Sequence, residues 1–183
     1  MHMLIAAFFL ALWPTVAASD LLQQTGIVML MRHATAPGTG DPPGFRVDDC
    51  ATQRTLSDAG RDEARRRGAQ FRAAGIRPDI LASSGWCRAR ETAELLDLGA
   101  VTHWPSLDSF FADRGREGTA SAETLAQLRG LGSGRALLVT HQVNITALTG
   151  IVPRSGEIIV TRLGSAGPGA AGRLTVLGRL PPP

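Results

Sequence analysis

The stretch that decides the fold is GIVMLMRHATAPG, residues 26–38. It begins with a short apolar run rich in strand-forming residues, which predicts a buried β-strand over Gly26–Met31. Arg32 and His33 follow directly. A loop rich in glycine and proline then extends over Ala34–Asp49. The stretch therefore predicts a buried strand that delivers a cation and a histidine to the edge of a sheet.

A second apolar run ends in the same way. Residues Ala136–Thr140 form another predicted buried strand, and His141 comes immediately after it. A third short strand is predicted over Asp79–Ala82, and Arg88 follows it within a few residues. In α/β sheets, ligands bind beyond the carboxyl ends of the strands. We therefore expect His33, His141 and Arg88 to gather at one edge of the sheet.

The rest of the chain alternates between helical and strand patterns. Helices are predicted over Leu56–Gly75, Gly85–Leu96, Ser121–Leu131 and Val143–Leu148, and further strands over Ala100–His103, Glu157–Leu163 and Arg173–Leu177. Ser57 is the expected N-cap of the first helix, on which small and apolar residues form a narrow stripe. The alternation predicts an α/β fold, a three-layer sandwich with a mostly parallel central sheet flanked by helices.

Composition limits the function classes. The chain has 183 residues, which indicates one domain, and 19 basic residues against 16 acidic ones, a net charge of +3. This charge is too small to suggest a nucleic-acid partner. No P-loop, nucleophile elbow or dinucleotide fingerprint is present. The histidines and cysteines lack the spacing of zinc ligands, so we expect neither a metal nor a cofactor.

The N-terminus resembles a secretory signal. Leu4–Trp13 is apolar but too short to span a bilayer, which takes about 20 apolar residues. Small residues at Val16-Ala17-Ala18 suit a signal peptidase, so we expect a signal peptide over residues 1–18 and a mature domain over residues 19–183. The start of this segment carries only His2 and no Lys or Arg, which leaves an uncleaved membrane anchor as the alternative. The expected location is periplasmic or secreted, without a stable membrane span after cleavage.

The two cysteines, Cys50 and Cys87, fit an exported protein. An even pair in an oxidising compartment suggests a disulfide, and two unpaired buried thiols are the alternative. The bridge would tether the loop Ala34–Asp49 beside the segment that carries Arg88.

The residues at the strand ends suit phosphoryl transfer. A neutral imidazole is an effective nucleophile, and the planar fork of arginine binds phosphate oxygens in pairs. Four segments also resemble, in order, the signature of the histidine phosphatase superfamily, whose fold is phosphoglycerate-mutase-like: MLMRHATAPG, LSDAGRDEA, SSGWCRARETA and LVTHQVNITALTG. Together they span Gly26–Gly150. Ala34 and Gln142 stand where that signature has glycine.

The resemblance implies roles for individual residues. His33 would be the nucleophile that becomes phosphohistidine, while Arg32, Arg88 and His141 would line the phosphate pocket. Two further residues have an implied contact and an alternative role. Thr35 would add a hydroxyl contact or cap the loop, and Arg54 would hold substrate groups or brace the loop.

A carboxylic acid is expected to protonate the leaving group. Asp113 is the preferred candidate, because the neighbouring Phe110 and Phe111 provide apolar surroundings that raise a carboxyl pKa. The other candidates are Asp108, Glu117 and Glu123, and some relatives lack this acid altogether.

The sequence thus predicts a metal-independent phosphomonoesterase of the histidine acid phosphatase type, acting through phosphohistidine. Its partner would be a small phosphorylated substrate, either a small organic phosphate or a glycan phosphate. The alternative is a catalytically weak or inactive protein of the cell envelope that binds phosphorylated ligands.

Overall fold

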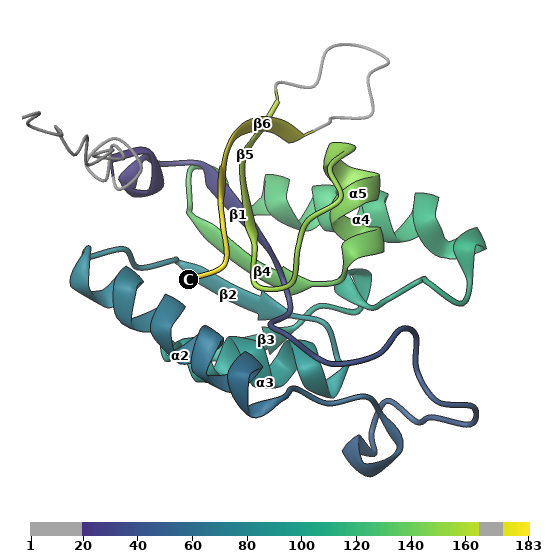
Figure 1. Ribbon diagram of the computed structural model, residues 1–183. Coiled ribbons are helices and arrows are strands. Elements are labelled where there is room, and N and C mark those ends of the chain that lie inside the picture. Colours follow the sequence, from purple (N-terminus) through teal and green to yellow (C-terminus); the bar gives the residue numbers. More distant parts are fainter. Residues whose placement is uncertain (1–19, 165–173) are drawn as a thin grey trace, which may run out of the picture.

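A six-stranded sheet forms the centre of the computed structural model, which describes residues 20–164 and 174–183 (Figure 1). The strands are β1 (Ile27–Arg32), β2 (Ile80–Ser83), β3 (Val101–His103), β4 (Ala136–Thr140), β5 (Ile158–Leu163) and β6 (Leu174–Leu180). Their order is β3-β2-β4-β1-β5-β6. Neighbours from β3 to β1 pair in parallel, whereas β5 pairs antiparallel with both β1 and β6.

Helices cover both faces of this sheet (Figure 1). Their bounds are α2 (Asp58–Ala73), α3 (Cys87–Leu96), α4 (Glu117–Gly130) and α5 (Gln142–Thr149), and three short 3-10 helices are η1 (Cys50–Thr52), η2 (Pro105–Leu107) and η3 (Arg114–Arg116). Residues of α2 and α3 share one apolar cluster with the sheet, and residues of α4 and α5 share a second cluster. The predicted three-layer α/β sandwich is therefore confirmed.

The central strand β1 explains why its sequence is apolar throughout. Met29 and Met31 pack into the cluster with α2 and α3, while Val28 and Leu30 pack into the cluster with α4 and α5. Because successive side chains of a strand point to opposite faces, a strand covered on both sides needs an apolar residue at every position.

Helix α2 approaches its neighbours closely through glycine. Ser57 is its N-cap, as predicted, and accepts a hydrogen bond from the Gly60 N–H at 3.0 Å. A Cβ atom at Gly60 would lie 2.1 Å from the Thr35 carbonyl oxygen, and one at Gly68 would lie 1.9 Å from the Leu96 carbonyl oxygen. The predicted stripe of small residues therefore lets α2 lie against both α3 and the loop that follows His33.

Two element boundaries differ from the prediction by more than two residues. Helix α4 begins at Glu117 rather than Ser121, because η3 leads straight into its first turn. Strand β6 continues to Leu180 rather than Leu177, and its pairing with β5 shifts register between Val160 and Thr161. Residues 165–173, between these strands, and the predicted signal peptide lie outside the described residues.

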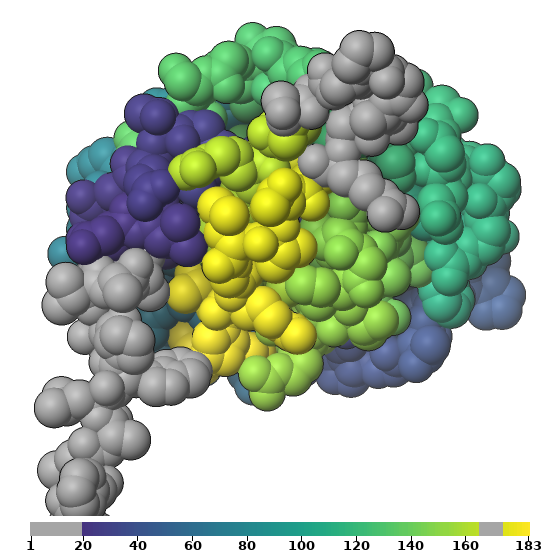
Figure 2. Space-filling view, turned by 90° about the horizontal axis from the view of Figure 1, so that it is seen from above, coloured from purple at the N-terminus to yellow at the C-terminus, as the bar shows by residue number. Residues whose placement is uncertain are grey.

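Strand β6 is the last strand at one side of the sheet. Figure 2 shows it along the surface, between the first described residues of the chain and the α4–α5 layer. Just beyond it, the Pro181 carbonyl accepts a hydrogen bond from the buried Arg67 guanidinium, which ties the C-terminus to α2. Within residues 20–164 and 174–183, no helix has the length and apolar character needed to cross a membrane.

Candidate active site

The carboxyl ends of β1 and β4 place two histidines side by side. Arg32 pairs with Thr140 in the register of these parallel strands, so His33 and His141 leave the sheet at the same level. Their ring centroids are 5.5 Å apart, and both side chains are buried. The two residues that the sequence placed at one edge of the sheet therefore meet there.

A pocket of about 160 Å³ opens above this edge. The predicted site residues that line it are Arg32, His33, Arg54, Arg88 and His141. Its remaining walls come from the loop residues Gly38–Asp41, from Ser109 and Phe111 before η3, and from Gln142 and Val143 at the start of α5.

The hydrogen bonds of His33 define its reactive nitrogen. Its Nδ1 lies 2.8 Å from the Ala34 carbonyl oxygen, and because a carbonyl only accepts, Nδ1 carries the proton. The lone pair is therefore on Nε2, which accepts a hydrogen bond from Arg88 Nε at 3.3 Å. Burial, assisted by the nearby charges of Arg88 and Arg32 and opposed by the Ala34 bond, lowers the pKa of His33 to about 3. His33 is thus a neutral imidazole with its lone pair directed into a cationic pocket.

His141 is held in a similar state. Its Nε2 lies 2.8 Å from the Ser84 hydroxyl, and the Trp86 ring packs edge-on against its imidazole at 5.5 Å. Burial, together with the neighbouring His33 and Arg88, lowers the pKa of His141 well below its ordinary value. Both imidazoles therefore stay neutral over the physiological pH range.

The arginines give the pocket its charge. Arg32 donates to the Pro153 carbonyl at 3.0 Å, and its buried Nε has no hydrogen-bond partner in the structure. Arg54 donates to the Gly40 carbonyl at 2.9 Å and also to the Ala36 carbonyl. A buried donor without a partner and several guanidinium groups around one cavity suit a ligand with anionic oxygens.

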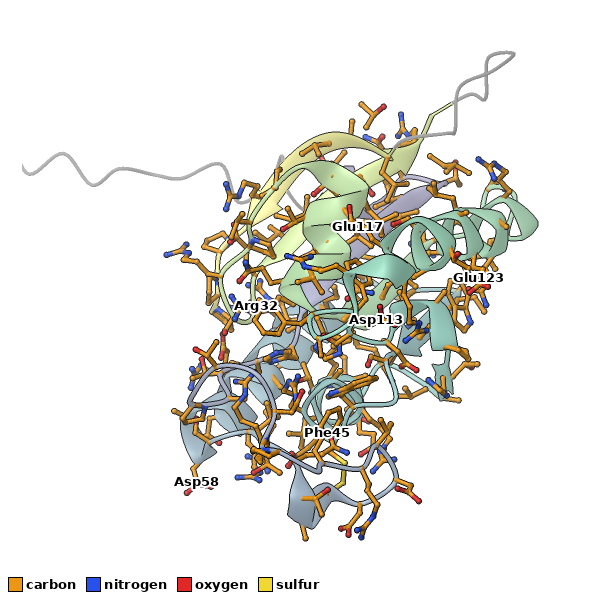
Figure 3. The ribbon with its side chains drawn as sticks, turned by 90° about the vertical axis from the view of Figure 1, so that its right-hand side faces the viewer. Arg32, Phe45, Asp58, Asp113, Glu117 and Glu123 are labelled. Atoms are coloured by element: carbon orange, nitrogen blue, oxygen red, sulfur yellow. A yellow bond between two sulfur atoms is a disulfide. The ribbon has the colours of Figure 1, made fainter. Side chains whose placement is uncertain are left out.

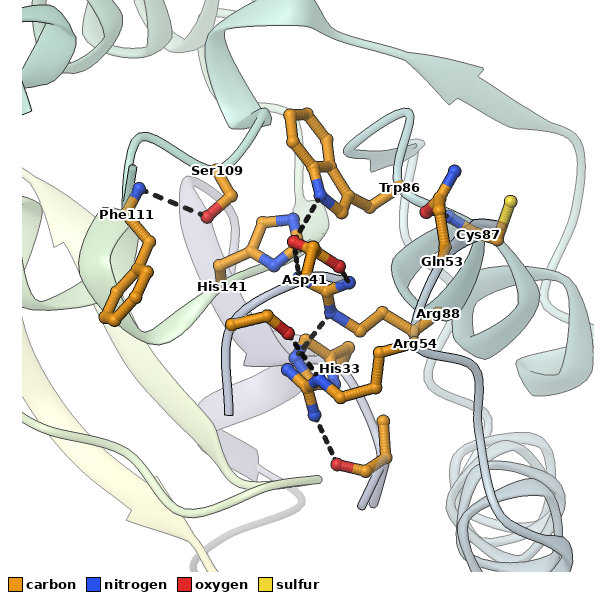
Figure 4. Close-up of polar contacts among 12 residues, drawn as sticks. His33, Asp41, Gln53, Arg54, Trp86, Cys87, Arg88, Ser109, Phe111 and His141 are labelled. Atoms are coloured by element: carbon orange, nitrogen blue, oxygen red, sulfur yellow. Dashed lines mark hydrogen bonds and ion pairs between the residues drawn. The ribbon is translucent and has the colours of Figure 1, made fainter. Parts of the chain in front are cut away.

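One charged residue of the pocket was not found from the sequence. The Asp41 carboxylate pairs with both terminal nitrogens of Arg88, at 2.5 Å and 3.2 Å, and accepts a hydrogen bond from Trp86 Nε1 at 3.0 Å (Figure 4). In the sequence Asp41 is only one acidic residue in a Gly/Pro-rich loop. Its partner lies 47 positions away, so no local pattern indicates the pairing.

Two predicted residues lie outside the lining of the pocket. The Thr35 amide and hydroxyl both donate to the Glu63 carboxylate at 3.0 Å, a contact that holds the loop against α2. The exposed Asp113 caps η3, where it accepts the Gly115 N–H. The structure therefore gives each of them a local structural contact.

The other candidate acids also lie outside the lining of the pocket. Asp108 accepts hydrogen bonds from the Gly85 N–H at 2.7 Å and from His103 Nε2 at 3.0 Å. Glu117 and Glu123 belong to α4 (Figure 3). Among the described residues, Asp41 is the carboxylate that lines the pocket.

The predicted disulfide is confirmed. Cys50 and Cys87 are bridged, with their Cα atoms 5.7 Å apart, and the Cys87 N–H also donates to the Gln53 side chain at 3.0 Å. The bridge joins the end of the pocket loop to the first turn of α3, beside Arg88. Among the described residues, no three or more His, Cys, Asp or Glu side chains are arranged to hold a metal ion.

No protein-family model and no curated protein matches the chain, whereas solved structures do. The protein histidine phosphatase SixA complexed with tungstate matches with a TM-score of 0.61 and 21% identity, over 85% of this chain and 97% of that chain. The putative phosphohistidine phosphatase SixA from Agrobacterium tumefaciens matches with a TM-score of 0.57 and 20% identity, over 86% and 97% of the two chains. A putative alpha-ribazole-5'-P phosphatase from Escherichia coli matches with a TM-score of 0.58 and 16% identity, over 83% and 95%. The likeness shows that this chain shares the fold of these solved structures, which is the fold that its motifs predicted.

Proposed function

We propose that this protein is a phosphatase that hydrolyses phosphate monoesters through a phosphohistidine at His33 and requires no metal. The observation that carries the proposal is the neutral His33, whose Nε2 lone pair faces Arg88 in a pocket that Arg32 and Arg54 also line. The names of the matched structures, which include histidine and ribazole phosphatases, support the same class of reaction.

In the first step the substrate phosphate binds between the arginines and His33. The Nε2 lone pair attacks phosphorus, an N–P bond forms, and the P–O bond to the leaving group breaks with its electron pair on oxygen. Arg88 Nε then donates to a phosphoryl oxygen instead of to the imidazole. Fixed guanidinium groups stabilise the charge on the phosphoryl oxygens in the transition state.

In the second step a water molecule attacks the phosphoryl group. An O–P bond forms as the water releases a proton to solvent, the N–P bond breaks, and its electron pair returns to Nε2 of His33, which releases inorganic phosphate. The hydrogen bond from Nδ1 to the Ala34 carbonyl keeps the ring in one orientation through both steps.

The leaving group would lie against the outer wall of the pocket. Phe111 is 53% exposed there, beside Ser109 and Gln142, and presents an apolar face for an organic group. The predicted acid, Asp113, caps η3, so we propose that the leaving oxygen takes its proton from solvent. Substrates with good leaving groups are then favoured. We propose the natural substrates that the sequence suggested, namely small organic phosphates or glycan phosphates.

We further propose that the protein is exported. The Cys50–Cys87 bridge supports this location, because disulfides persist mainly in oxidising compartments.

The absence of a candidate acid from the pocket lining favours one alternative, a protein that binds phosphorylated ligands without turnover. Steady hydrolysis of p-nitrophenyl phosphate, whose leaving group needs little protonation, would exclude this alternative. A protein that binds phosphate esters but releases no phosphate from any of them would support it.

The mechanism is tested by the His33→Ala variant. We expect it to lose turnover and phosphate labelling, whereas wild-type protein quenched during turnover carries an acid-labile, alkali-stable phosphoryl group. Excess EDTA should leave wild-type activity unchanged. His103→Ala is the matched control, since His103 also lies at the end of a sheet strand but is exposed and lies outside the pocket lining. Full activity in His33→Ala would contradict the proposal.

A further inference from the structure

Arg88 makes contacts with opposite sides of its guanidinium group. Its Nε donates to His33 Nε2 at 3.3 Å, and its terminal nitrogens, NH1 and NH2, form the two-point ion pair with Asp41. Figure 4 shows His33 and Asp41 on either side of this guanidinium. The pair is secluded, with the Arg88 side chain 3% exposed and the Asp41 side chain 11% exposed. Because the guanidinium group is planar, an ion pair that holds its terminal nitrogens also fixes the direction of its Nε–H.

Asp41 is itself held in place. Its carboxylate accepts the Trp86 Nε1–H, and the Trp86 ring packs between Phe45 and His141, with centroid distances of 5.7 Å and 5.5 Å. The backbone just before Asp41 is braced by the bond from Arg54 to the Gly40 carbonyl. Asp41 is therefore a rigid support for Arg88.

The same contacts argue against two other roles. Burial raises the pKa of Asp41, but the hydrogen bonds and charge of Arg88 outweigh it, and the pKa falls below its ordinary value. An ionised carboxylate has no proton to give a leaving group. Asp41 also occupies the edge of Arg88 that faces away from His33, so it leaves the Nε edge free for a phosphoryl oxygen and does not compete for it.

From this geometry we infer that Asp41 is a positioning residue, which orients the Arg88 guanidinium so that its Nε edge faces the phosphoryl group on His33. The inference rests on the proposed phosphatase function. Among the described residues, the Arg88 side chain has one other hydrogen bond, to His33, so Asp41 is its remaining orienting contact.

A double-mutant cycle tests whether Asp41 acts through Arg88. We expect Asp41→Ala to lower kcat on p-nitrophenyl phosphate by about 10–100-fold with little change in KM, the size of loss found when a partner that orients a metal-ligating side chain is removed. In an Arg88→Ala background the same change should cost less than about twofold, because there is no longer a guanidinium to orient. Asp48→Ala is the matched control, an exposed carboxylate on the same loop, and should leave kcat unchanged.

The conservative variant Asp41→Asn separates a loss of orientation from a simple loss of folding. Its amide oxygen still accepts an N–H of Arg88, so we expect activity between that of wild type and that of Asp41→Ala. Equal losses from Asp41→Ala with and without Arg88 would overturn the inference. So would a loss confined to alkyl phosphates, which would make Asp41 a proton donor.

Binding of tungstate separates this inference from the proposed function. If the wild-type protein showed no turnover, the proposed phosphatase function would be refuted. Its oriented guanidinium groups would still bind the oxyanion, so the positioning role could still be measured. We expect Asp41→Ala to weaken tungstate binding about tenfold when Arg88 is present and not when it is absent. Tighter tungstate binding in Asp41→Ala would show that the carboxylate competes with the ligand and would overturn the positioning role.

Discussion

At the scale of residues, three histidines lie at or just beyond the ends of strands of the same sheet and have different environments. His33 and His141 are buried at the ends of the adjacent strands β1 and β4, and burial lowers the pKa of both. His103 ends β3 at one side of the sheet, where its side chain is 50% exposed and bonds Asp108. Position in the sheet, rather than residue type, therefore decides which imidazole is suited to attack phosphorus.

The two pocket arginines outside β1 are expected to differ in substitution experiments. Arg88→Lys keeps the charge but loses the fork that contacts both His33 and Asp41, so kcat should fall by about 100-fold or more, as when one oxyanion donor is removed. Arg54 mainly bonds the loop carbonyls of Ala36 and Gly40. Arg54→Lys should therefore change KM, most for bulky substrates, and largely spare kcat on p-nitrophenyl phosphate.

Steady-state kinetics of both variants on one small and one bulky phosphate ester would check this difference. An equal fall of kcat on the small ester would mean that Arg54, too, stabilises the transition state.

At the scale of elements, the contact between α2 and α3 depends on a glycine. Gly68→Ala would normally favour a helix, but here the new Cβ meets the Leu96 carbonyl oxygen of α3 at 1.9 Å. We expect the substitution to lower the free energy of unfolding by about 1–3 kcal/mol, the usual cost of overpacking. Gly118→Ala in α4 is the control, because a Cβ there meets nothing within 4 Å. That variant should be neutral or slightly more stable in urea unfolding. A stabilised Gly68→Ala protein would contradict the packing described for α2.

The disulfide joins two elements that build the pocket. The bridge from Cys50 to Cys87 spans a sequence separation of 37 and restricts the unfolded chain. By the loop-entropy model its removal in a Cys50→Ser/Cys87→Ser variant should cost about 3–4 kcal/mol of unfolding free energy. Urea unfolding of the two proteins measures this difference, and thiol titration of unreduced wild type should detect no free thiol. Two titratable thiols per chain would contradict the bridge.

At the scale of the whole molecule, the buried neutral histidines make stability depend on pH. The pKa of His33 is about 3 in the folded protein against 6.5 ordinarily, so between these values the unfolded chain binds a proton that the folded protein does not. Stability should therefore be complete above about pH 6.5 and decline as the pH falls, by about 1.4 kcal/mol per pH unit for each such histidine.

Urea unfolding between about pH 7 and pH 4.5 measures this slope. The range spans the ordinary histidine pKa and stays above the pKa of most carboxyl groups. His33→Asn should reduce the slope. A flat profile in wild type would show that the buried imidazoles accept protons without loss of the fold.

Much of this architecture follows from the sequence because its causes are local. Strands β1 and β4 are buried on both faces, and a continuous apolar run predicts such a strand from the local sequence alone. Parallel strands then end at one edge of the sheet, so His33 and His141 meet because β1 and β4 are parallel neighbours. The Ser57 cap and the glycine stripe of α2 are likewise predicted by the spacing of residues within the helix.

The tertiary structure alone decided which polar side chains of the loops face the pocket. Asp41 pairs with Arg88 because its loop turns through Gly38, Gly40 and Gly44, all with positive φ, a path that no periodic pattern encodes. For the same reason Asp113, chosen for its apolar neighbours, instead caps η3. A strand or helix places its side chains by a repeating geometry, whereas a loop places them by contacts with distant parts of the chain. The strand-end residues of the site were therefore determined by the sequence, and its loop residues by the fold.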